Sequence, residues 1–360
     1  MELFATTALV ATSSAVVAAV IGYPIGNWLA SLGPGLKRVV SAIVLVPFLL
    51  PPFLIGLTLL PLQPSPINST TGILWIVGAH VFMNAGFIAS VVSANQVPKN
   101  QLEAADLDGA GAIRIRALIE LPQQLPGIVS ASLLVALYSA TSYGLVLTLG
   151  QAEVETLETA VATAALRELD LFSAGALALL QTLLTLGFFL LARSLSAEPS
   201  PLFGEQESFA RGSKLGAAMA VLLLLAVAVV IGGVLVRAVT LGPGLVENLA
   251  NLTGRGTRDL LNISVLDAAL NSLRNLAVAA AIAIPVSWLA AGRSKASYLV
   301  LLPVGISPVV FGLVFLVLSG YLPVELSSSW LIVPFVQSLF LIPLSYQVLR
   351  PARQSVSKDL

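Results

Sequence analysis

Long apolar runs separated by short polar segments dominate the chain. A helix needs about 20 apolar residues to cross the hydrocarbon core of a bilayer. The predicted spans, nine in all, are Thr6–Ala30, Val39–Leu62, Gly72–Ser93, Leu125–Leu149, Phe172–Ala192, Leu215–Val236, Ala268–Ala290, Tyr298–Gly320 and Leu331–Leu349. These runs are far longer than a strand of a membrane barrel. The pattern therefore predicts an all-α, polytopic transmembrane helix bundle.

The composition excludes several classes of protein. Of the 360 residues, 57% are hydrophobic and 10% are charged, which is too few charges for the surface of a water-soluble domain. Eighteen Lys and Arg balance eighteen Asp and Glu, so no basic excess points to nucleic acid. Cysteine is absent and His80 is the single histidine, which argues against thiol chemistry and a histidine-built metal centre. We expect no catalytic residues, metal or cofactor.

The distribution of Lys and Arg predicts the orientation of the spans in a plasma membrane. With the loop after the third span taken as cytoplasmic, thirteen basic residues lie on the cytoplasmic side and five on the other. The thirteen are Lys37, Arg38, Lys99, Arg114, Arg116, Arg193, Arg211, Lys214, Arg293, Lys295, Arg350, Arg353 and Lys358. The predicted external loop Gln151–Asp170 is acidic instead. This orientation places the amino terminus outside and the carboxy terminus inside.

Two parts of the chain share a proline pattern. Pro47, Pro52 and Gly56 have the spacing P-x4-P-x3-G, and Pro303, Pro308 and Gly312 repeat it at an offset of 256 residues. In both cases a span ending in Trp-Leu-Ala and a short basic turn come before. A shared kink would explain one such match, but the joint match favours duplication. We expect a first repeat at residues 1–193, a cytoplasmic linker at 194–213 and a second repeat at 214–360, cut before its own counterpart of Glu103, so that the chain is a fragment.

The segment between the third and fourth spans, residues 101–122, predicts a short helix, a glycine turn and a second helix. Ala104 and Ala105 favour helix and offer a smooth surface that another protein can approach. Gly109 can take the positive φ that a sharp turn requires, and Pro122 suits the first turn of the next membrane helix. Taken alone, the segment is also compatible with an ordinary amphipathic connector.

The same segment reads E-A-A-x3-G-x9-I-x-L-P. It resembles the EAA loop of permease subunits in binding-protein-dependent ABC importers, and it matches all seven fixed positions. The resemblance implies an ABC importer permease of the type I fold, with an incomplete second repeat. It also implies that Glu103, Ala104, Ala105 and Gly109 face a cytoplasmic ATPase. Ile119, Leu121 and Pro122 would fix the loop to the bundle.

The resemblance also implies the partners: a cytoplasmic ABC ATPase dimer, an extracytoplasmic solute-binding protein, and a second permease half or copy. ATP would be hydrolysed by the ATPase, because the chain has no Walker lysine loop. The repeat is similar to fused permeases for thiamine and for ferric iron. The run Ala79-His80-Val81-Phe82-Met83-Asn84 resembles a segment of the thiamine branch. Family members carry two EAA loops, whereas this chain has one.

Polar residues within the spans are candidates for the translocation path. The densest group lies in the fourth span and consists of Tyr138, Ser139, Thr141, Ser142 and Tyr143. Hydrogen bonding between helices is an equally good interpretation of this group. His80 and Asn84 share a helix face, and we expect them to tie two helices together rather than to bind solute.

Three functions compete at this point. We expect an importer permease for thiamine or a related small solute, with ferric iron as the alternative. Aromatic residues such as Tyr138 and Tyr143 favour an organic cation, and the absence of a carboxylate near the centre of any span disfavours iron. The same absence disfavours a secondary carrier. The missing second loop leaves a non-transporting membrane scaffold as the remaining alternative.

Overall fold

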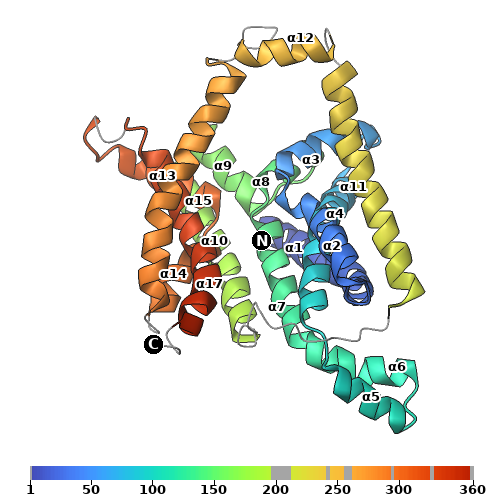
Figure 1. Cartoon of the computed structure of the whole chain (residues 1–360). Coiled ribbons are helices and arrows are strands. Elements are labelled where there is room, and N and C mark those ends of the chain that lie inside the picture. The colour runs from blue at the N-terminus through green and yellow to red at the C-terminus, as the bar shows by residue number, and fades with distance from the viewer. Residues whose placement is uncertain are drawn as a thin grey trace. The chain divides into compact units, whose positions relative to one another are not determined.

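The computed structural model describes residues 2–195, 212–240, 244–254, 262–292, 296–324 and 328–356. These residues form helices and contain no strand (Figure 1), which confirms the all-α fold class. The chain divides into two compact units, Met1–Ile231 and Gly232–Leu360. Most of the predicted linker lies outside the described residues, as do Arg211, Arg255, Arg258, Arg293, Lys295 and Lys358 of the charge pattern.

Among its described residues, the first unit contains ten helices and part of an eleventh, with two short helical turns. They are α1 (Glu2–Ala30), α2 (Pro34–Leu49), α3 (Pro52–Leu59), η1 (Leu60–Leu62), α4 (Ser69–Ala94), α5 (Lys99–Leu107), α6 (Ala112–Ile115), η2 (Arg116–Glu120), α7 (Leu121–Ala140), α8 (Tyr143–Leu149), α9 (Leu157–Leu166), α10 (Leu171–Leu195) and the first part of α11 (Lys214–Thr240). Within the second unit the described elements are α12 (Leu245–Ala250), η3 (Asn251–Thr253), α13 (Val265–Ala291), α14 (Ala296–Leu301), η4 (Leu302–Gly305), α15 (Pro308–Ser319) and α17 (Ile332–Val356).

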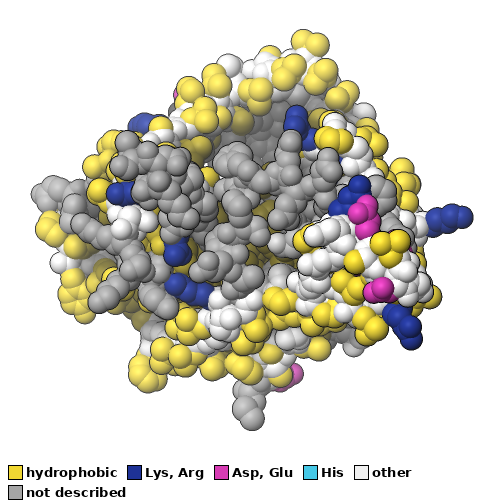
Figure 2. Space-filling model, turned by 60° about the horizontal axis from the view of Figure 1, so that its bottom comes forward, with side chains coloured by type: hydrophobic (Ala, Val, Ile, Leu, Met, Phe, Trp, Pro, Cys, Tyr) yellow, Lys and Arg dark blue, Asp and Glu magenta, His cyan; other side chains and the backbone are white. Residues whose placement is uncertain are grey.

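Seven of the described helices are long and apolar enough to cross a membrane, or up to nine if each of two bent helix pairs counts as one span. The bent pairs are Pro34–Leu49 with Pro52–Leu62, at 86°, and Leu299–Gly305 with Pro308–Ser319, at 102°. On the face that Figure 2 shows, hydrophobic side chains cover much of the coloured surface and charged side chains appear as isolated groups. Such a surface is typical of a protein embedded in a membrane. The chain is thus a multi-pass helical membrane protein.

The two bends occur at the repeated prolines. Pro52 begins α3 and Pro308 begins α15, because proline lacks the N–H of a helix interior but suits the first helical turn. The sequence predicted Val39–Leu62 and Tyr298–Gly320 as single spans, whereas the structure sharply bends both. A sharp bend thus occurs at each copy of the repeated proline pattern.

The helices α1 and α4 form the most extensive contact of the first unit. Gly22 and Gly26 lie four residues apart on the face of α1 that meets α4. A Cβ atom at these positions would come within 2.7 Å of Ala85 O and 2.5 Å of Ala89 O, respectively. Such small residues let two helix backbones approach closely where lipid gives no hydrophobic drive for association. The close contact makes α1 and α4 a tightly packed pair.

The predicted fourth span, Leu125–Leu149, is wrong in its boundaries. Its helix starts earlier and ends at Ala140, and α8 begins separately at Tyr143 after a break at Thr141 and Ser142. Buried amide side chains donate to the last carbonyl group of each helix. Gln181 Nε2 donates to Ala140 O at the end of α7 at 2.9 Å, and Gln63 Nε2 donates to Leu149 O at the end of α8 at 2.8 Å. Backbone carbonyls freed inside a membrane need such partners.

The predicted external acidic loop, Gln151–Asp170, is also different in the structure, because it contains the apolar helix α9. Its first turn buries Glu158 completely, while Thr7 Oγ1 of α1 accepts a hydrogen bond from Leu157 N at 2.9 Å. The sequence places Glu158 in an external loop, whereas the structure buries it in α9, a short helix outside the predicted spans. At the other end of the segment, hydrogen bonds from Ser173 lower the pKa of Asp170, which caps α10.

In the second unit, α13 packs mainly on α17. Ser287 Oγ donates to Ile342 O at 2.9 Å, and the guanidinium of Arg353 lies over the ring of Trp288 with its Cζ 5.2 Å from the ring centre. Trp288 belongs to the Trp-Leu-Ala sequence that precedes the second copy of the proline pattern. These contacts hold the end of α13 against the end of α17.

A glycine also sets the contact between α3 and α8. Thr148 Oγ1 of α8 occupies the position where a Cβ of Gly56 would lie, whereas Gly312, the counterpart of Gly56 in α15, has no atom within 4 Å of its Cβ position among the described residues. The two glycines occupy the same place in the repeated proline pattern but meet different surroundings.

We therefore expect Gly56→Ala to lower the stability of the chain and Gly312→Ala to leave it unchanged or slightly raise it. For Gly56→Ala, overpacking against Thr148 costs about 1–3 kcal/mol. For Gly312→Ala, which has room for the added methyl group, the higher helix propensity of alanine favours the folded state. Thermal unfolding midpoints in detergent would measure both. Equal midpoints for Gly56→Ala and the unchanged chain would contradict the close α3–α8 contact.

Candidate functional site

The segment between α4 and α7 forms a helix–turn–helix that projects past the lower end of α7 (Figure 1). The first helix, α5, follows Pro98, whose fixed φ suits the position before a helix. After α5, Gly109 has a φ of +76°, which only glycine adopts at little cost. The chain then turns into α6. The helix, glycine turn and second helix thus have the local geometry predicted from the sequence.

The segment has a small apolar core of its own. Val97, Leu102, Ala105 and Ile115 are buried together, and Ile119 packs against them. Ala105 is 8% exposed, so it packs inward and is not part of the approachable surface that the sequence predicted for it. This core holds α5 and α6 in a fixed arrangement on the end of α7.

The outer surface of the segment carries the other predicted contact residues. Glu103, Ala104 and Gly109 are exposed, and Glu103 pairs with Lys99 at 3.5 Å between Oε1 and Nζ. Two large apolar side chains stand out beside them: Leu107 is 89% exposed and Ile113 is 84% exposed. Sequence reasoning missed both, although apolar residues at the ends of a short polar loop are a usable signal.

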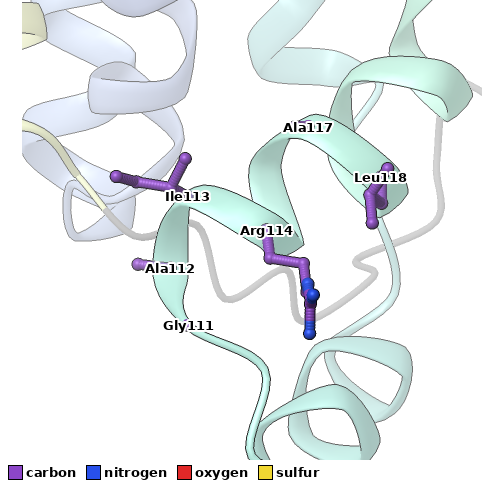
Figure 3. A pocket seen from close by; sticks show the side chains of 6 residues that line it. All are labelled: Gly111, Ala112, Ile113, Arg114, Ala117 and Leu118. Carbon is purple, nitrogen blue, oxygen red and sulfur yellow. The ribbon is translucent and has the colours of Figure 1, made fainter.

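A shallow depression lies on the second helix of the segment (Figure 3). Gly111, Ala112, Ile113, Arg114, Ala117 and Leu118 line it. Its lining is mostly apolar and small, with the Arg114 side chain extending from one side (Figure 3). The lining of the depression carries one positive charge, that of Arg114, and no nucleophilic or acidic side chain.

The segment joins the bundle through an unbroken helical stretch, Ala112–Ala140. A π-helical turn, η2, interrupts the regular α pattern, and Leu121 N bonds to Arg116 O across it. Pro122 follows directly and lacks the N–H that a regular helix would bond to Leu118 O, so a wider turn suits this point. Leu121 and Pro122 are exposed, and of the residues predicted to fix the loop, only Ile119 packs against its core.

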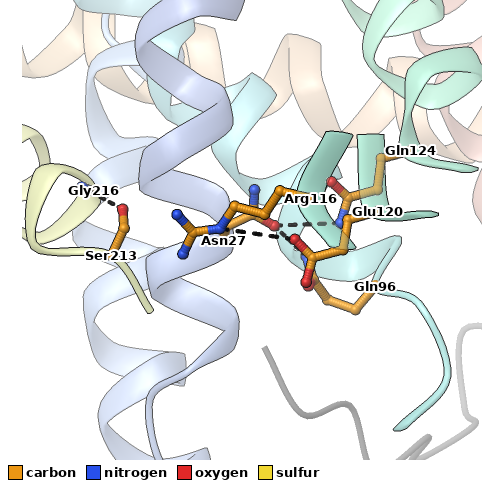
Figure 4. Close-up of polar contacts among 7 residues, drawn as sticks. All are labelled: Asn27, Gln96, Arg116, Glu120, Gln124, Ser213 and Gly216. Atoms are coloured by element: carbon orange, nitrogen blue, oxygen red, sulfur yellow. Dashed lines mark hydrogen bonds and ion pairs between the residues drawn. The ribbon is translucent and has the colours of Figure 1, made fainter. Parts of the chain in front are cut away.

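Three amide side chains meet where α7 passes the C-terminal end of α1 (Figure 4). Asn27 Oδ1 accepts hydrogen bonds from Gln96 Nε2 at 3.2 Å and from Gln124 Nε2 at 3.3 Å. One turn before Gln124, Glu120 Oε2 lies 3.9 Å from Arg116 Nε. We call Asn27, Gln96 and Gln124 the amide junction. Sequence reasoning missed the junction, because its members lie up to 97 residues apart and share no spacing.

His80 and Asn84 lie deep in α4, where they are 2% and 4% exposed. Asn84 Nδ2 donates to His80 O of its own helix at 2.7 Å, and His80 Nδ1 lies 3.3 Å from Ser14 Oγ of α1. The contact between His80 and Ser14 links α4 to α1. This geometry favours a structural role for His80 over solute binding.

The polar group predicted in the fourth span is located at the break between α7 and α8. Tyr138 and Tyr143 are 38% and 37% exposed. The ring centres of Tyr138 and Phe48 lie 6.0 Å apart in an edge-to-face arrangement. Thr141 Oγ1 donates to Leu137 O of its own helix at 3.2 Å. Among the described residues, the buried hydroxyls of Ser139 and Ser142 have no hydrogen-bond partner. The break thus brings both unpaired hydroxyls and exposed tyrosine rings together.

Within the described part of the chain, no group of three or more His, Asp or Glu is placed to hold a metal ion.

Comparisons with known proteins point to transport. PhnU of Salmonella typhi, named as a permease protein of a 2-aminoethylphosphonate transport system, is 34% identical over 103 residues, which are 29% of this chain and 36% of PhnU. The molybdenum transport system permease protein ModB of Azotobacter vinelandii is 29% identical over 154 residues, which are 39% of this chain and 68% of ModB. The match thus spans about a third of the PhnU relatives' length. No family model matches the chain.

Among solved structures, inward-facing MetNI, a methionine ABC transporter, covers 55% of this chain and 98% of its own, with a TM-score of 0.39 and 20% identity. At that score the likeness adds no argument about the fold. The sequence relatives are transport permeases and not enzymes, and their solutes differ from the thiamine and ferric iron suggested by the sequence. The chain is therefore related in sequence to permease proteins of solute transport systems.

Proposed function

We propose that the chain is a translocation subunit of an ATP-driven ABC importer in a bacterial plasma membrane. The observation that carries this proposal is the E-A-A-x3-G-x9-I-x-L-P sequence, which coincides with an exposed helix–turn–helix on the end of α7. Permease relatives support the transport part of the proposal. The ATPase partner, the solute-binding protein and the second permease half or copy follow from the resemblance.

The loop docks on the cytoplasmic ATPase through the exposed side of α5 and the turn after it. Glu103, Ala104 and Gly109 contribute a small, polar surface, and Leu107 and Ile113 contribute apolar anchors. Large apolar side chains exposed on a water-facing loop are typical of a protein–protein interface. Ala105 supports this surface from beneath.

Hydrolysis of ATP occurs in the partner, and this chain supplies two alternative conformations of the bundle. Nucleotide binding favours one conformation and solute delivery the other, through contacts that differ between the two states. The break at Thr141 and Ser142 is the best candidate for the translocation path, because two buried hydroxyls that have no partner among the described residues, those of Ser139 and Ser142, lie there near the partly exposed rings of Tyr138 and Tyr143.

For the solute, we propose only a small molecule taken from an external binding protein. Tyr138 and Tyr143 suit an organic cation such as thiamine. The relatives are named for 2-aminoethylphosphonate and molybdenum, so these solutes belong in any uptake assay beside thiamine and ferric iron.

One observation favours a second function, a secondary carrier. Glu158 is completely buried in α9, and proton-coupled carriers use carboxyl groups inside the membrane. Uptake that persists after ATP depletion and stops when the proton gradient is collapsed would support this alternative and contradict an ATP-driven importer.

We expect Leu107→Asp to weaken association with the ATPase by on the order of tenfold or more, because a buried charge replaces an apolar anchor at the interface. The measurement is the amount of ATPase that co-purifies with the tagged chain. Phe172→Asp is the matched control, because Phe172 is 88% exposed but lies at the start of α10, on the predicted external side. Equal loss of ATPase in both variants, or in neither, would contradict the docking surface.

A second variant pair tests the turn that orients this surface. Gly109→Ala places a Cβ at a φ of +76°, which costs roughly 1–2 kcal/mol, and we expect weaker ATPase association and faster proteolysis of the loop. Gly111→Ala serves as the control, since the φ of Gly111 is −67° and no atom of the described residues lies within 4 Å of its Cβ position. Loss of association in Gly111→Ala but not in Gly109→Ala would show that the turn has no such role.

A further inference from the structure

The amide junction connects three separate parts of the first unit. Asn27 comes from α1, Gln96 follows α4, and Gln124 belongs to α7. Asn27 is 7% exposed and Gln124 is 1% exposed, so water competes little for their hydrogen bonds. Figure 4 shows the three side chains converging at the base of α1. A single oxygen, Asn27 Oδ1, accepts from both glutamines.

The junction is continuous with the candidate coupling loop. Gln124 lies one turn after Glu120, which ends the π-helical turn and pairs with Arg116. Glu120 is almost fully buried. Arg116, Glu120 and Gln124 therefore follow one another along one face of the helix, from the loop into the bundle. Any rotation or displacement of the loop moves this face directly.

Hydrogen bonds at this point restrict motion in a way that apolar packing does not. Apolar contacts have no preferred direction, whereas a hydrogen bond of an amide side chain depends on both direction and distance. A buried amide left without its partner is also costly. The junction therefore fixes α7 to α1 at the level of Gln124, and a displaced α7 has to take α1 with it or exchange partners.

The effect extends from α1 to α4. Gly22 and Gly26, just before Asn27, bring α1 into close contact with the α4 backbone. Gln96 ties the end of α4 to the same Asn27 oxygen and also donates to Val92 O at 2.6 Å. The helices α1 and α4 thus receive any displacement of α7 as one packed pair.

We propose that Asn27 is a positioning residue that transmits movement of the coupling loop to α1 and α4 during the ATP-driven cycle. This role rests on the proposed function, since it needs an ATPase to move the loop. The alternative is that the junction contributes only to the stability of the fold. The two roles differ in whether loss of the hydrogen bonds uncouples an otherwise intact complex.

The experiment uses the tagged chain purified with its ATPase and reconstituted into lipid nanodiscs. Three quantities are measured: ATPase bound per chain, thermal unfolding midpoint, and ATP hydrolysis per bound ATPase relative to the ATPase alone. Asn27→Leu removes the acceptor at nearly constant size, and Asn27→Asp keeps acceptor oxygens. Gln96→Ala removes one donor, and Asn95→Ala is its control, because the exposed Asn95 amide bonds Val91 O of its own helix.

We expect Asn27→Leu to bind ATPase within twofold of the unchanged chain and to lose at least tenfold of the stimulation of ATP hydrolysis. Asn27→Asp should keep at least half of the stimulation. Gln96→Ala should lose stimulation severalfold at an unchanged midpoint, while Asn95→Ala behaves as the unchanged chain. If Asn27→Leu fails to fold, Gln96→Ala and Asn27→Asp decide the result.

Full stimulation in Gln96→Ala and in a folded Asn27→Leu would overturn the role of the junction and leave the proposed function intact. A loss of stimulation that merely follows a lowered unfolding midpoint, and that Asn27→Asp does not rescue, would assign the junction to stability alone. An unchanged chain that binds no ATPase would instead overturn the proposed function, and this role with it.

Discussion

The unbroken helical stretch from Ala112 to Ala140 is the constraint on which the functional interpretation depends. A loop connected by flexible chain could bind a partner without moving the bundle. Here the loop has its own packed core around Leu102 and Ile115, and its second helix continues into a membrane span. A force applied to α5 or α6 is therefore carried into the membrane along one continuous helical element, through the π-helical turn η2.

The membrane environment explains the other recurring features. Lipid provides no hydrogen bonds and little drive for helices to associate. Helices therefore approach through glycine, as at Gly22 and Gly26, and broken helix ends recruit buried amides, as Gln181 does at Ala140. Because unpaired polar groups are costly inside a membrane, the partner of each interior polar group helps to indicate its role. The contact between His80 and Ser14 ties helices together, whereas the hydroxyls of Ser139 and Ser142 have no protein partner among the described residues.

The sequence predicted the features that depend on local pattern. Apolar runs predicted the membrane helices and Gly109 predicted the turn, since each of these follows from a few neighbouring residues. The bends at the repeated prolines were not predicted, because sequence reasoning treats both stretches as single spans. It missed features that depend on distant contacts. Sequence reasoning places Glu158 in an external loop as one of several carboxylates, and it places Ala105 on an approachable surface as one of two helix-favouring alanines. The amide junction joins residues whose spacing carries no period.

The most direct test of the central claim is site-specific cross-linking in intact cells. The natural chain contains no cysteine, so a single introduced cysteine is unambiguous. Ala104→Cys, on the exposed side of α5, is predicted to cross-link to an ABC ATPase, whereas Ala105→Cys, buried beneath it at 8% exposure, is predicted to give little product. Failure of Ala104→Cys to capture any ATPase, in a chain that is folded and inserted, would contradict the claim that this loop couples the bundle to ATP hydrolysis.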